Sequence, residues 1–189
     1  MAPRRRQMIR GGAVICYLLL LALQVSSVRA SDLTASGREF VQKFYDIYVP
    51  KALAGQPSPP WRLAVDKMSA DFDGELIEAL KDDLAAQAKA QEQTQAEGGD
   101  IVGLDFDPFL DSQDPAKRYE VGSVRQEGAD YLVDVYAVTS GKRSEQPSVV
   151  PELAYQDGHW HFVNFRYPEG GDLLTLLKQM KADRESQQN

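Results

Sequence analysis

Residues 118–139, RYEVGSVRQEGADYLVDVYAVT, alternate apolar and polar side chains on either side of a turn at Gly128. A period of two places alternate side chains on opposite faces of a β-strand, and the Val and Tyr residues of this stretch favour strands. Two further stretches of this type, residues 148–156 and 159–167, are joined by an Asp-Gly hairpin signal at residues 157–158. The sequence therefore predicts four successive antiparallel strands.

Helical periodicity flanks the strands on both sides. Thr34 or Ser36 is expected to cap a first helix that runs to about Val49. A long helix is expected to end near residue 91, and Asp172 is expected to cap a C-terminal helix. This order of elements predicts an α+β fold, with N-terminal helices and a C-terminal helix packed on one face of a curved, mainly antiparallel four-stranded sheet.

The first helix has a broad apolar arc, with Gln42 and Asp46 on the opposite, solvent-facing side. The arc is formed by Phe40, Val41, Phe44, Tyr45, Ile47 and Tyr48. An arc this wide and aromatic is typical of a helix that packs across a sheet. A curved sheet of this kind can form a cone, with a pocket between the sheet and the helices.

The first thirty residues are typical of an export signal. Four arginines precede an apolar stretch, residues 13–23, and Val-Arg-Ala at residues 28–30 resembles a cleavage site. Because eleven apolar residues fall short of the ~20 that span a bilayer, we expect cleavage near Ala30-Ser31 and no stable membrane anchor. The protein would then be periplasmic or secreted, by the general secretory or the twin-arginine route.

This interpretation divides the chain into a signal peptide (1–30), a single α+β domain (31–182) and a flexible tail (183–189). The only cysteine, Cys16, lies in the signal, so the mature chain would hold no disulfide and no thiolate. Loss of the five basic residues of the signal lowers the net charge from −7 to −12. Such an acidic protein repels phosphate backbones, so no nucleic-acid partner is expected.

Three stretches resemble a family of exported bacterial proteins, domain of unknown function 3828, within the cone folds similar to nuclear transport factor two. They are FVQKFYDIYV (40–49), LDFDPFLDSQD (104–114) and DGHWHFVNFRYP (157–168). The resemblance implies the cone fold over residues 40–168 and brings no assigned activity. Some members carry a lipoprotein cysteine, which this chain lacks.

The loop GLDFDPFLDSQDP, residues 103–115, holds four aspartates among aromatic residues and prolines. An EF-hand that started at Asp105 would need an oxygen ligand at its fifth position and glycine at its sixth, where this chain has Phe109 and Leu110. We therefore expect Asp105 and Asp107 to accept hydrogen bonds from backbone or side-chain donors while the aromatic neighbours become buried. Calcium binding in another geometry is the alternative.

Few residues outside this loop are candidates for metal binding or catalysis. His159 and His161 lie two positions apart, but two histidines alone do not make a metal site. Asp134 and Tyr136 share one strand face. In a concave apolar site they would act as a base and a donor in an isomerase or dehydratase, as the resemblance allows. Otherwise Asp134 faces solvent or pairs with a neighbour such as Arg125.

The leading hypothesis is an exported, non-enzymatic binding or interaction domain with an aromatic-lined pocket. Its partner would be a small apolar ligand or an envelope protein, and no catalytic residue, cofactor or metal is assigned. The candidate binding residues are Tyr48, Trp61, Asp105, Asp107, Tyr136 and Trp160. A further alternative is an inhibitor or immunity-type protein whose acidic surface attracts a secreted enzyme.

Overall fold

The computed structural model describes residues 12–55, 58–97 and 102–186. The chain divides into two units, Met1–Ser36 and Gly37–Asn189, and the second unit contains the sheet and its helices. Helix α1 spans Gly12–Ala52 and so runs through the boundary between them. Among the described residues, no helix combines the length and the apolar character needed to cross a membrane.

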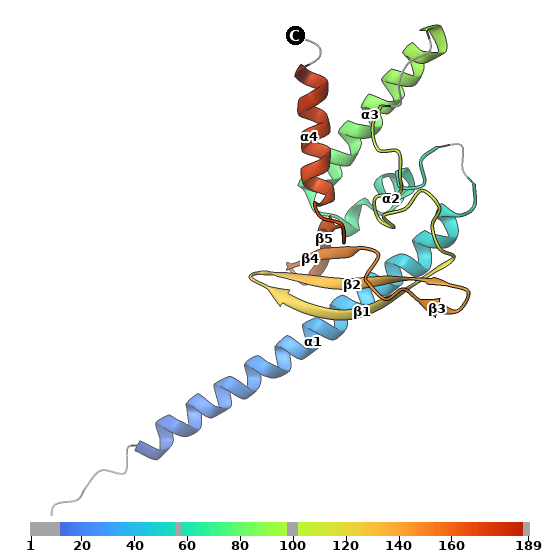
Figure 1. The fold of residues 1–189 in the computed structure, drawn as a ribbon. Coiled ribbons are helices and arrows are strands. Elements are labelled where there is room, and N and C mark those ends of the chain that lie inside the picture. The colour runs from blue at the N-terminus through green and yellow to red at the C-terminus, as the bar shows by residue number, and fades with distance from the viewer. Residues whose placement is uncertain (1–11, 56–57, 98–101, 187–189) are drawn as a thin grey trace, which may run out of the picture. The chain divides into compact units, whose positions relative to one another are not determined.

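The sheet is a curved antiparallel meander that does not close into a barrel (Figure 1). Its strands are β1 (Arg118–Glu127), β2 (Asp130–Thr139), β3 (Lys142–Arg143), β4 (Val150–Gln156) and β5 (His159–Arg166). The order is β1-β2-β4-β5, and the short β3 pairs only with β2. The predicted α+β fold and the four long strands are therefore confirmed, and β3 is an addition in the connection between the second and third of them.

Two irregularities accompany the curvature of the sheet. The β1–β2 register shifts between Val121 and Val124, and the β4–β5 register shifts between Glu152 and Leu153. Extra residues of this kind bend a strand and increase its twist. Within the first shift, a Cβ on Gly122 would lie 2.4 Å from Cε2 of Tyr136, so a larger residue would not fit there without a shift of the ring.

The remaining helices are α2 (Arg62–Lys67), the 3-10 turn η1 (Ser69–Asp71), α3 (Gly74–Glu97) and α4 (Leu173–Ser186). Asp172 caps α4 as predicted, because its Oδ1 accepts the backbone N–H of Thr175 at 2.9 Å. The predicted caps of the first helix are wrong. Since α1 begins at Gly12, Thr34 and Ser36 lie inside it, and the Ser36 hydroxyl donates to the carbonyl of Leu33.

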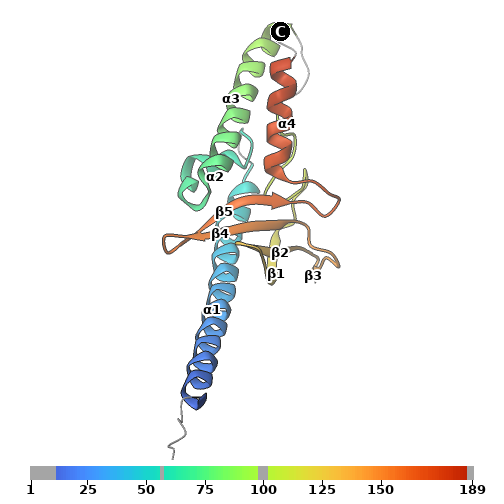
Figure 2. The ribbon, with the colours of Figure 1, turned by 90° about the vertical axis from the view of Figure 1, so that its left-hand side faces the viewer.

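From Gly37 onward, α1 packs on one face of the sheet (Figures 1 and 2). Most of the predicted apolar arc is buried, but Ile47 is 39% exposed, so the arc is narrower than expected. Gln42 does not simply face water: its amide accepts the N–H of Val121 at 3.0 Å and donates to the carbonyl of Tyr119 at 3.3 Å. Arg38 donates to the carbonyl of Val121 at 2.7 Å. These side chains satisfy backbone groups along the open edge of β1.

Helices α3 and α4 lie side by side (Figure 2). They are joined by Lys178–Glu75, Lys181–Asp82 and Arg184–Asp83 ion pairs of 2.6, 2.5 and 3.0 Å. Because Arg184 reaches the fully buried Asp83, α4 remains ordered through Ser186. The predicted flexible tail, residues 183–189, begins within this helix, and residues 187–189 lie outside the described residues.

The space between α1 and the sheet is filled by aromatic rings. Phe44, at its centre, has ring centroids 4.8 to 5.8 Å from those of several neighbours. These neighbours are Tyr45, Tyr48, Phe72, Phe109 and Phe162. All of these side chains are buried. The rings that were expected to line a pocket thus pack against one another and form the core.

Candidate functional site

The aspartate loop, residues 103–115, closes on itself around Asp107. Oδ1 of Asp107 accepts the N–H of Phe109 at 3.0 Å, and the backbone N–H of Asp107 donates to the carbonyl of Ser112 at 3.0 Å. The Asp107 carbonyl accepts the N–H of Leu110 at 3.2 Å. Asp107 is only 4% exposed, so these bonds are formed away from water, where a lost partner costs most. The predicted clamp is present at this residue.

Three tyrosines hold the loop against the rest of the domain. The Tyr48 hydroxyl donates to Oδ2 of Asp107 at 2.6 Å, and the Tyr45 hydroxyl donates to the carbonyl of Phe109 at 2.8 Å; both tyrosines come from α1. The hydroxyl of Tyr167, just after β5, donates to the carbonyl of Pro108 at 3.3 Å. The loop is thereby fixed to two elements that are distant in sequence.

The start of the loop is tied to a third element, α3. The fully buried Asp83 accepts the backbone N–H of Leu104 at 3.0 Å, and the Gln87 amide donates to the carbonyl of Leu104 at 3.2 Å. A Cβ on Gly103 would lie 2.4 Å from Cγ of Gln87, and the φ of Gly103 is 93°. Both the contact and the backbone conformation explain why glycine occupies this position.

Burial shifts the pKa values of Asp107 and Tyr48. It raises the pKa of Asp107 to about 6, although the hydrogen bonds from Tyr48 and Phe109 act in the opposite direction. Burial, followed by the charge of Asp107, raises the pKa of Tyr48 well above its ordinary value. Tyr48 therefore remains a protonated donor at physiological pH, which is the role that the clamp requires.

The other residues proposed for metal chemistry are separate from this clamp. Asp105 is exposed and accepts a hydrogen bond of 3.3 Å from the Gln113 amide, so the two expected clamp aspartates differ in burial. His159 is exposed and His161 is half-buried. In the described part of the chain, no three histidine or acidic side chains are grouped in a way that could hold a metal ion.

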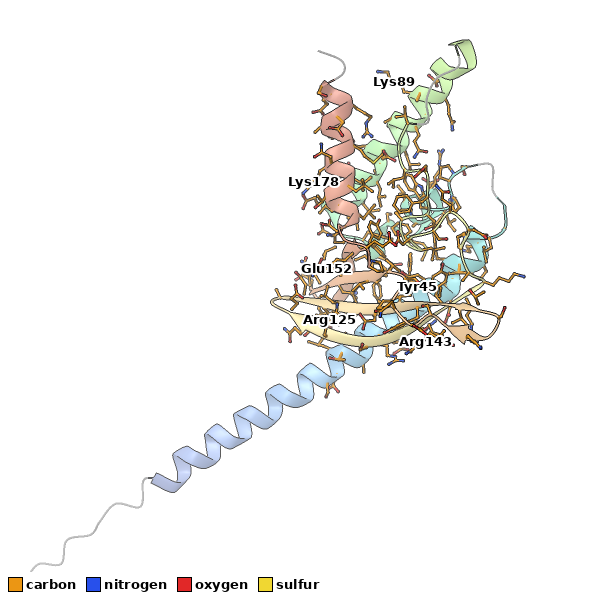
Figure 3. The ribbon with its side chains drawn as sticks, in the orientation of Figure 1. Tyr45, Lys89, Arg125, Arg143, Glu152 and Lys178 are labelled. Atoms are coloured by element: carbon orange, nitrogen blue, oxygen red, sulfur yellow. The ribbon has the colours of Figure 1, made fainter. Side chains whose placement is uncertain are left out.

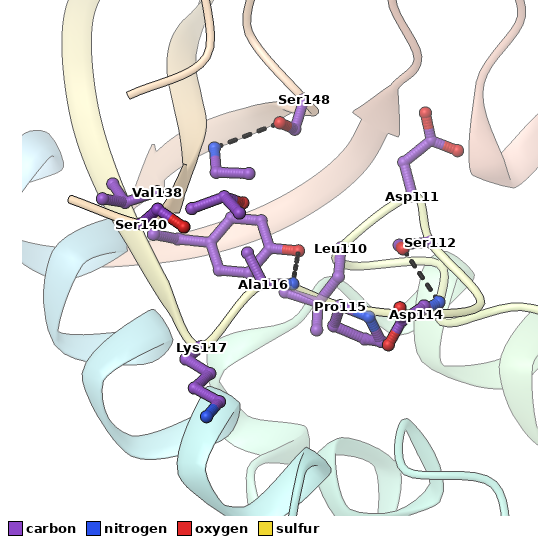
Figure 4. Close-up of a pocket in the computed structure, with 13 residues that line it drawn as sticks. Leu110, Asp111, Ser112, Asp114, Pro115, Ala116, Lys117, Val138, Ser140 and Ser148 are labelled. Carbon is purple, nitrogen blue, oxygen red and sulfur yellow. Dashed lines mark hydrogen bonds between the residues drawn. The ribbon is translucent and has the colours of Figure 1, made fainter. Parts of the chain in front are cut away.

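The aspartate loop lies between two clefts and contributes lining residues to both. The larger, which we call the loop–strand cleft, has a volume of about 660 Å³ and lies between residues 110–117 and the ends of β1 and β2 (Figure 4). The smaller has a volume of about 330 Å³ and lies on the side of Trp61, Asp105 and Asp107. The loop therefore contributes a wall to each cleft.

The walls of the loop–strand cleft are held by hydrogen bonds (Figure 4). The Tyr119 hydroxyl accepts the N–H of Ala116 at 3.3 Å, and the Ser148 hydroxyl accepts the N–H of Ala137 at 3.1 Å. The lining is mixed: it combines leucine, valine, alanine and proline with serine, threonine, aspartate and a single lysine, Lys117. Asp111 is one of its acidic residues, and its pKa is raised by burial and by the charge of Glu169. Such a surface offers both apolar contact and hydrogen-bonding groups.

The six candidate binding residues fall into separate environments. Tyr48 and Asp107 are bonded to each other, and Trp61, Asp105 and Asp107 line the smaller cleft. Trp160 packs against Tyr131 and Tyr155, with ring centroids 5.0 and 4.9 Å apart. Tyr136 lies beneath the Arg143 guanidinium, 4.1 Å from the ring centroid. The structure thus brings four of the six to the aspartate loop, and the other two have contacts elsewhere on the sheet.

Asp134 lies in an ion pair. Nη1 of Arg125 is 2.6 Å from its Oδ1, and the Ser123 hydroxyl donates to its Oδ2 at 2.5 Å. Strand alternation places Asp134 and Tyr136 opposite the buried Val133 and Val135. Figure 3 shows Arg125 on the sheet. Pairing with Arg125 was the structural alternative to a catalytic role for Asp134.

The loop–strand cleft itself was missed from the sequence. Its lining comes from the aspartate loop, from β1 and β2, and from Ser148 before β4. Each segment is unremarkable alone, and only the fold brings them together. The sole local signal was the density of Asp, Ser and Pro in residues 111–115, which indicates a loop and nothing more specific.

Comparison with known proteins adds a structural neighbour of unknown function. No family model matches the chain, and no curated protein matches it. A solved structure of a protein of unknown function from Bacteroides thetaiotaomicron VPI-5482 is 18% identical, with a TM-score of 0.47. The match covers 76% of this chain and 98% of that chain.

Proposed function

We propose that this protein is an exported, non-enzymatic binding domain that recognises a segment of a partner protein in the loop–strand cleft. The observation that carries the proposal is the contrast between a filled aromatic core and an open cleft of about 660 Å³. Ligand sites commonly have volumes of roughly 300–1,000 Å³. The cleft lies within this range.

The chemistry of the cleft favours a polypeptide over a small apolar molecule. The half-buried Pro115, Ala116 and Ala137 offer apolar contact, and the hydroxyls of Ser112 and Ser140 belong to the same lining. Peptides present alternating apolar side chains and backbone polar groups, so a mixed lining suits them better than it suits a purely apolar ligand. Because the walls are fixed by internal hydrogen bonds, little ordering would be needed on binding.

Export rests on the N-terminal sequence, whose arginines, apolar stretch and small-residue cleavage pattern are typical of a signal. The partner would then be a protein of the cell envelope or of the exterior. The negative net charge of the mature chain would speed association with a basic partner without deciding affinity.

The test uses two tryptophan variants at exposed strand ends. Thr139→Trp places a large side chain in the cleft, whereas Gln156→Trp, at the end of β4, lies outside its lining. Affinity capture from an envelope extract of the source organism is expected to recover a partner with the wild type and Gln156→Trp, and to lose it with Thr139→Trp. Equal recovery by both variants would contradict binding in the cleft.

Native mass spectrometry distinguishes a partner protein from a small molecule as the ligand of the loop–strand cleft. Protein purified from its own envelope is expected to have the mass of the processed polypeptide alone. The contrary result is a small molecule that co-purifies with the wild type and with Gln156→Trp but not with Thr139→Trp. That result would show that the loop–strand cleft binds a small molecule and would contradict a protein partner there.

A further inference from the structure

A third cleft, of about 610 Å³, lies between the end of α1 and α2. We call it the basic groove. It is lined by Lys51, Ala54, Ser58, Pro59, Pro60, Arg62, Leu63, Asp66 and Lys67. It shares no lining residue with the loop–strand cleft, so the proposal below does not depend on the proposed function.

The residues that border the groove are a turn after α1, two prolines and the start of α2. After α1 the chain turns through Gly55, whose φ is 68°, and it returns through Pro59 and Pro60, which fix their own φ angles. The N–H of Arg62 donates to the carbonyl of Pro59 at 3.0 Å, which starts α2. The buried Trp61 anchors this return to the core.

The groove has an unusual charge for this protein. Three of its lining residues are basic and only Asp66 is acidic, in a chain whose net charge is −7. Asp66 pairs with Arg62 at 3.4 Å, and both side chains are about half exposed. Lys51 and Lys67 form no ion pair with any other residue in the described ranges. Both lysines are exposed, so their charges are available to a ligand.

Apolar surface accompanies these cations. Ile47 and Leu53 are 39% and 41% exposed, and they are two of the three large hydrophobic residues of the described chain that are exposed. Ile47 lies one helical turn before Lys51, and Leu53 directly precedes the lining residue Ala54. Neither residue lines the groove itself, so apolar contact inside the groove would come from its own leucine and prolines.

We propose that the basic groove binds an acidic segment of a partner protein, in which carboxylates flank apolar side chains. Charge complementarity carries this choice: Lys51 and Lys67 would pair with the carboxylates, while Leu63 and the two prolines would contact the apolar side chains. A nucleic acid or an anionic membrane fits less well, because the rest of the chain is acidic and would be repelled.

The experiment measures fluorescence anisotropy with a labelled eight-residue peptide of alternating Glu and Leu. A peptide with Gln in place of Glu, and one with Ser in place of Leu, are the matched probes. The wild-type protein is expected to bind the Glu-Leu peptide, and to bind each altered peptide at least about tenfold more weakly, because each lacks one of the two contributions. Higher salt is expected to weaken binding of the Glu-Leu peptide.

Two double variants with the same change in net charge locate the site. Lys51→Glu with Lys67→Glu is expected to weaken binding roughly tenfold, because two attractions become repulsions. Lys89→Glu with Lys142→Glu, on α3 (Figure 3) and β3, is expected to change it less than about twofold. All four lysines are exposed, and Ala54→Trp tests the groove by filling it without any change of charge.

Loss of binding in the groove variants alone would support the proposal. Equal loss in both double variants would overturn it, because the attraction would then belong to the whole protein. Absence of wild-type binding, or equal binding of the Gln-containing peptide, would also overturn it. Concentration-dependent self-association that the groove variants abolish would identify a second copy of this chain as the occupant and contradict a separate partner.

Discussion

The hydroxyl of Tyr48 donates a hydrogen bond of 2.6 Å to Oδ2 of Asp107, and it joins α1 to the aspartate loop across 59 positions of sequence. Asp107 also accepts the N–H of Phe109, so both of its carboxylate oxygens have a donor. The pair explains why an acidic, proline-containing loop remains fixed against an aromatic core. The loop in turn forms one wall of the loop–strand cleft.

The buried carboxylate of Asp107 predicts a specific dependence of stability on pH. Its pKa is raised from 3.8 to about 6, so between these values the folded state binds more protons than the unfolded state. The free energy of unfolding should therefore fall as pH rises through this window, by at most about 3 kcal/mol. Asp107→Asn keeps one oxygen acceptor for Phe109 and removes the titration, so it should flatten this dependence.

Urea unfolding at about pH 4 and about pH 7 measures this effect. The matched control is Asp105→Asn in the same loop, since Asp105 is exposed and accepts a hydrogen bond from the Gln113 amide. This variant should keep the wild-type pH dependence. An unchanged slope in Asp107→Asn would show that another group titrates in the window.

Removal of the Tyr48 hydroxyl should weaken the clamp from the other side. In Tyr48→Phe the ionised Asp107 loses its 2.6 Å donor, with an expected loss of about 1.5–3 kcal/mol at neutral pH. Tyr167→Phe removes a longer bond of 3.3 Å to a neutral carbonyl and should cost about 1 kcal/mol or less. Chemical denaturation of both variants compares the two costs. Equal costs would contradict a special role for the Tyr48–Asp107 pair.

The end of α4 should contribute to stability through Arg184. Arg184→Ala leaves the fully buried Asp83 without its ion-pair partner, although Leu104 and Gln87 still donate to it, and should cost about 2–3 kcal/mol. Lys178→Ala breaks an exposed pair with Glu75 and should cost less than about 1 kcal/mol. Thermal unfolding of the two variants checks this order. A neutral Arg184→Ala would mean that the C-terminal turn of α4 contributes little.

Gln42 should matter more than its polar character suggests. Gln42→Ala leaves the N–H of Val121 and the carbonyl of Tyr119 without this side chain, and an expected loss of about 1–2 kcal/mol follows. Glu39→Ala, one turn earlier at an exposed position of α1, is the control and should change stability by less than about 0.5 kcal/mol. Hydrogen exchange of the β1 amides should accelerate in the first variant only.

The strands and the clamp at Asp107 were predictable because their signals are local. Alternation in residues 118–139 specifies a hairpin without any knowledge of the partner strand, and an aspartate before a proline is typical of a side chain that bonds nearby backbone. The sequence did not distinguish Asp107 from Asp105. The difference depends on the Tyr48 hydroxyl, which reaches only one of them.

The remaining features depend on contacts between distant residues. Arg184 and Asp83 are 101 positions apart, so nothing local indicates that the C-terminal turn of α4 is anchored. Gln42 looks like a solvent-facing residue on a helical wheel, because a wheel does not represent the open edge of β1. The loop–strand cleft likewise combines segments, residues 110–119, 137–140 and 148, whose proximity exists only in the folded chain.

Both carboxylate oxygens of Asp107 accept hydrogen bonds within the protein, from Tyr48 and Phe109, so we expect the aspartate loop to be structural and to bind no cation. Isothermal titration calorimetry of the metal-free protein with Ca²⁺, and separately with Zn²⁺, tests it most directly. We expect no stoichiometric uptake of either cation by the wild type or by the double variant Asp105→Asn with Asp107→Asn. Tight one-to-one uptake by the wild type that this double variant abolishes would contradict it.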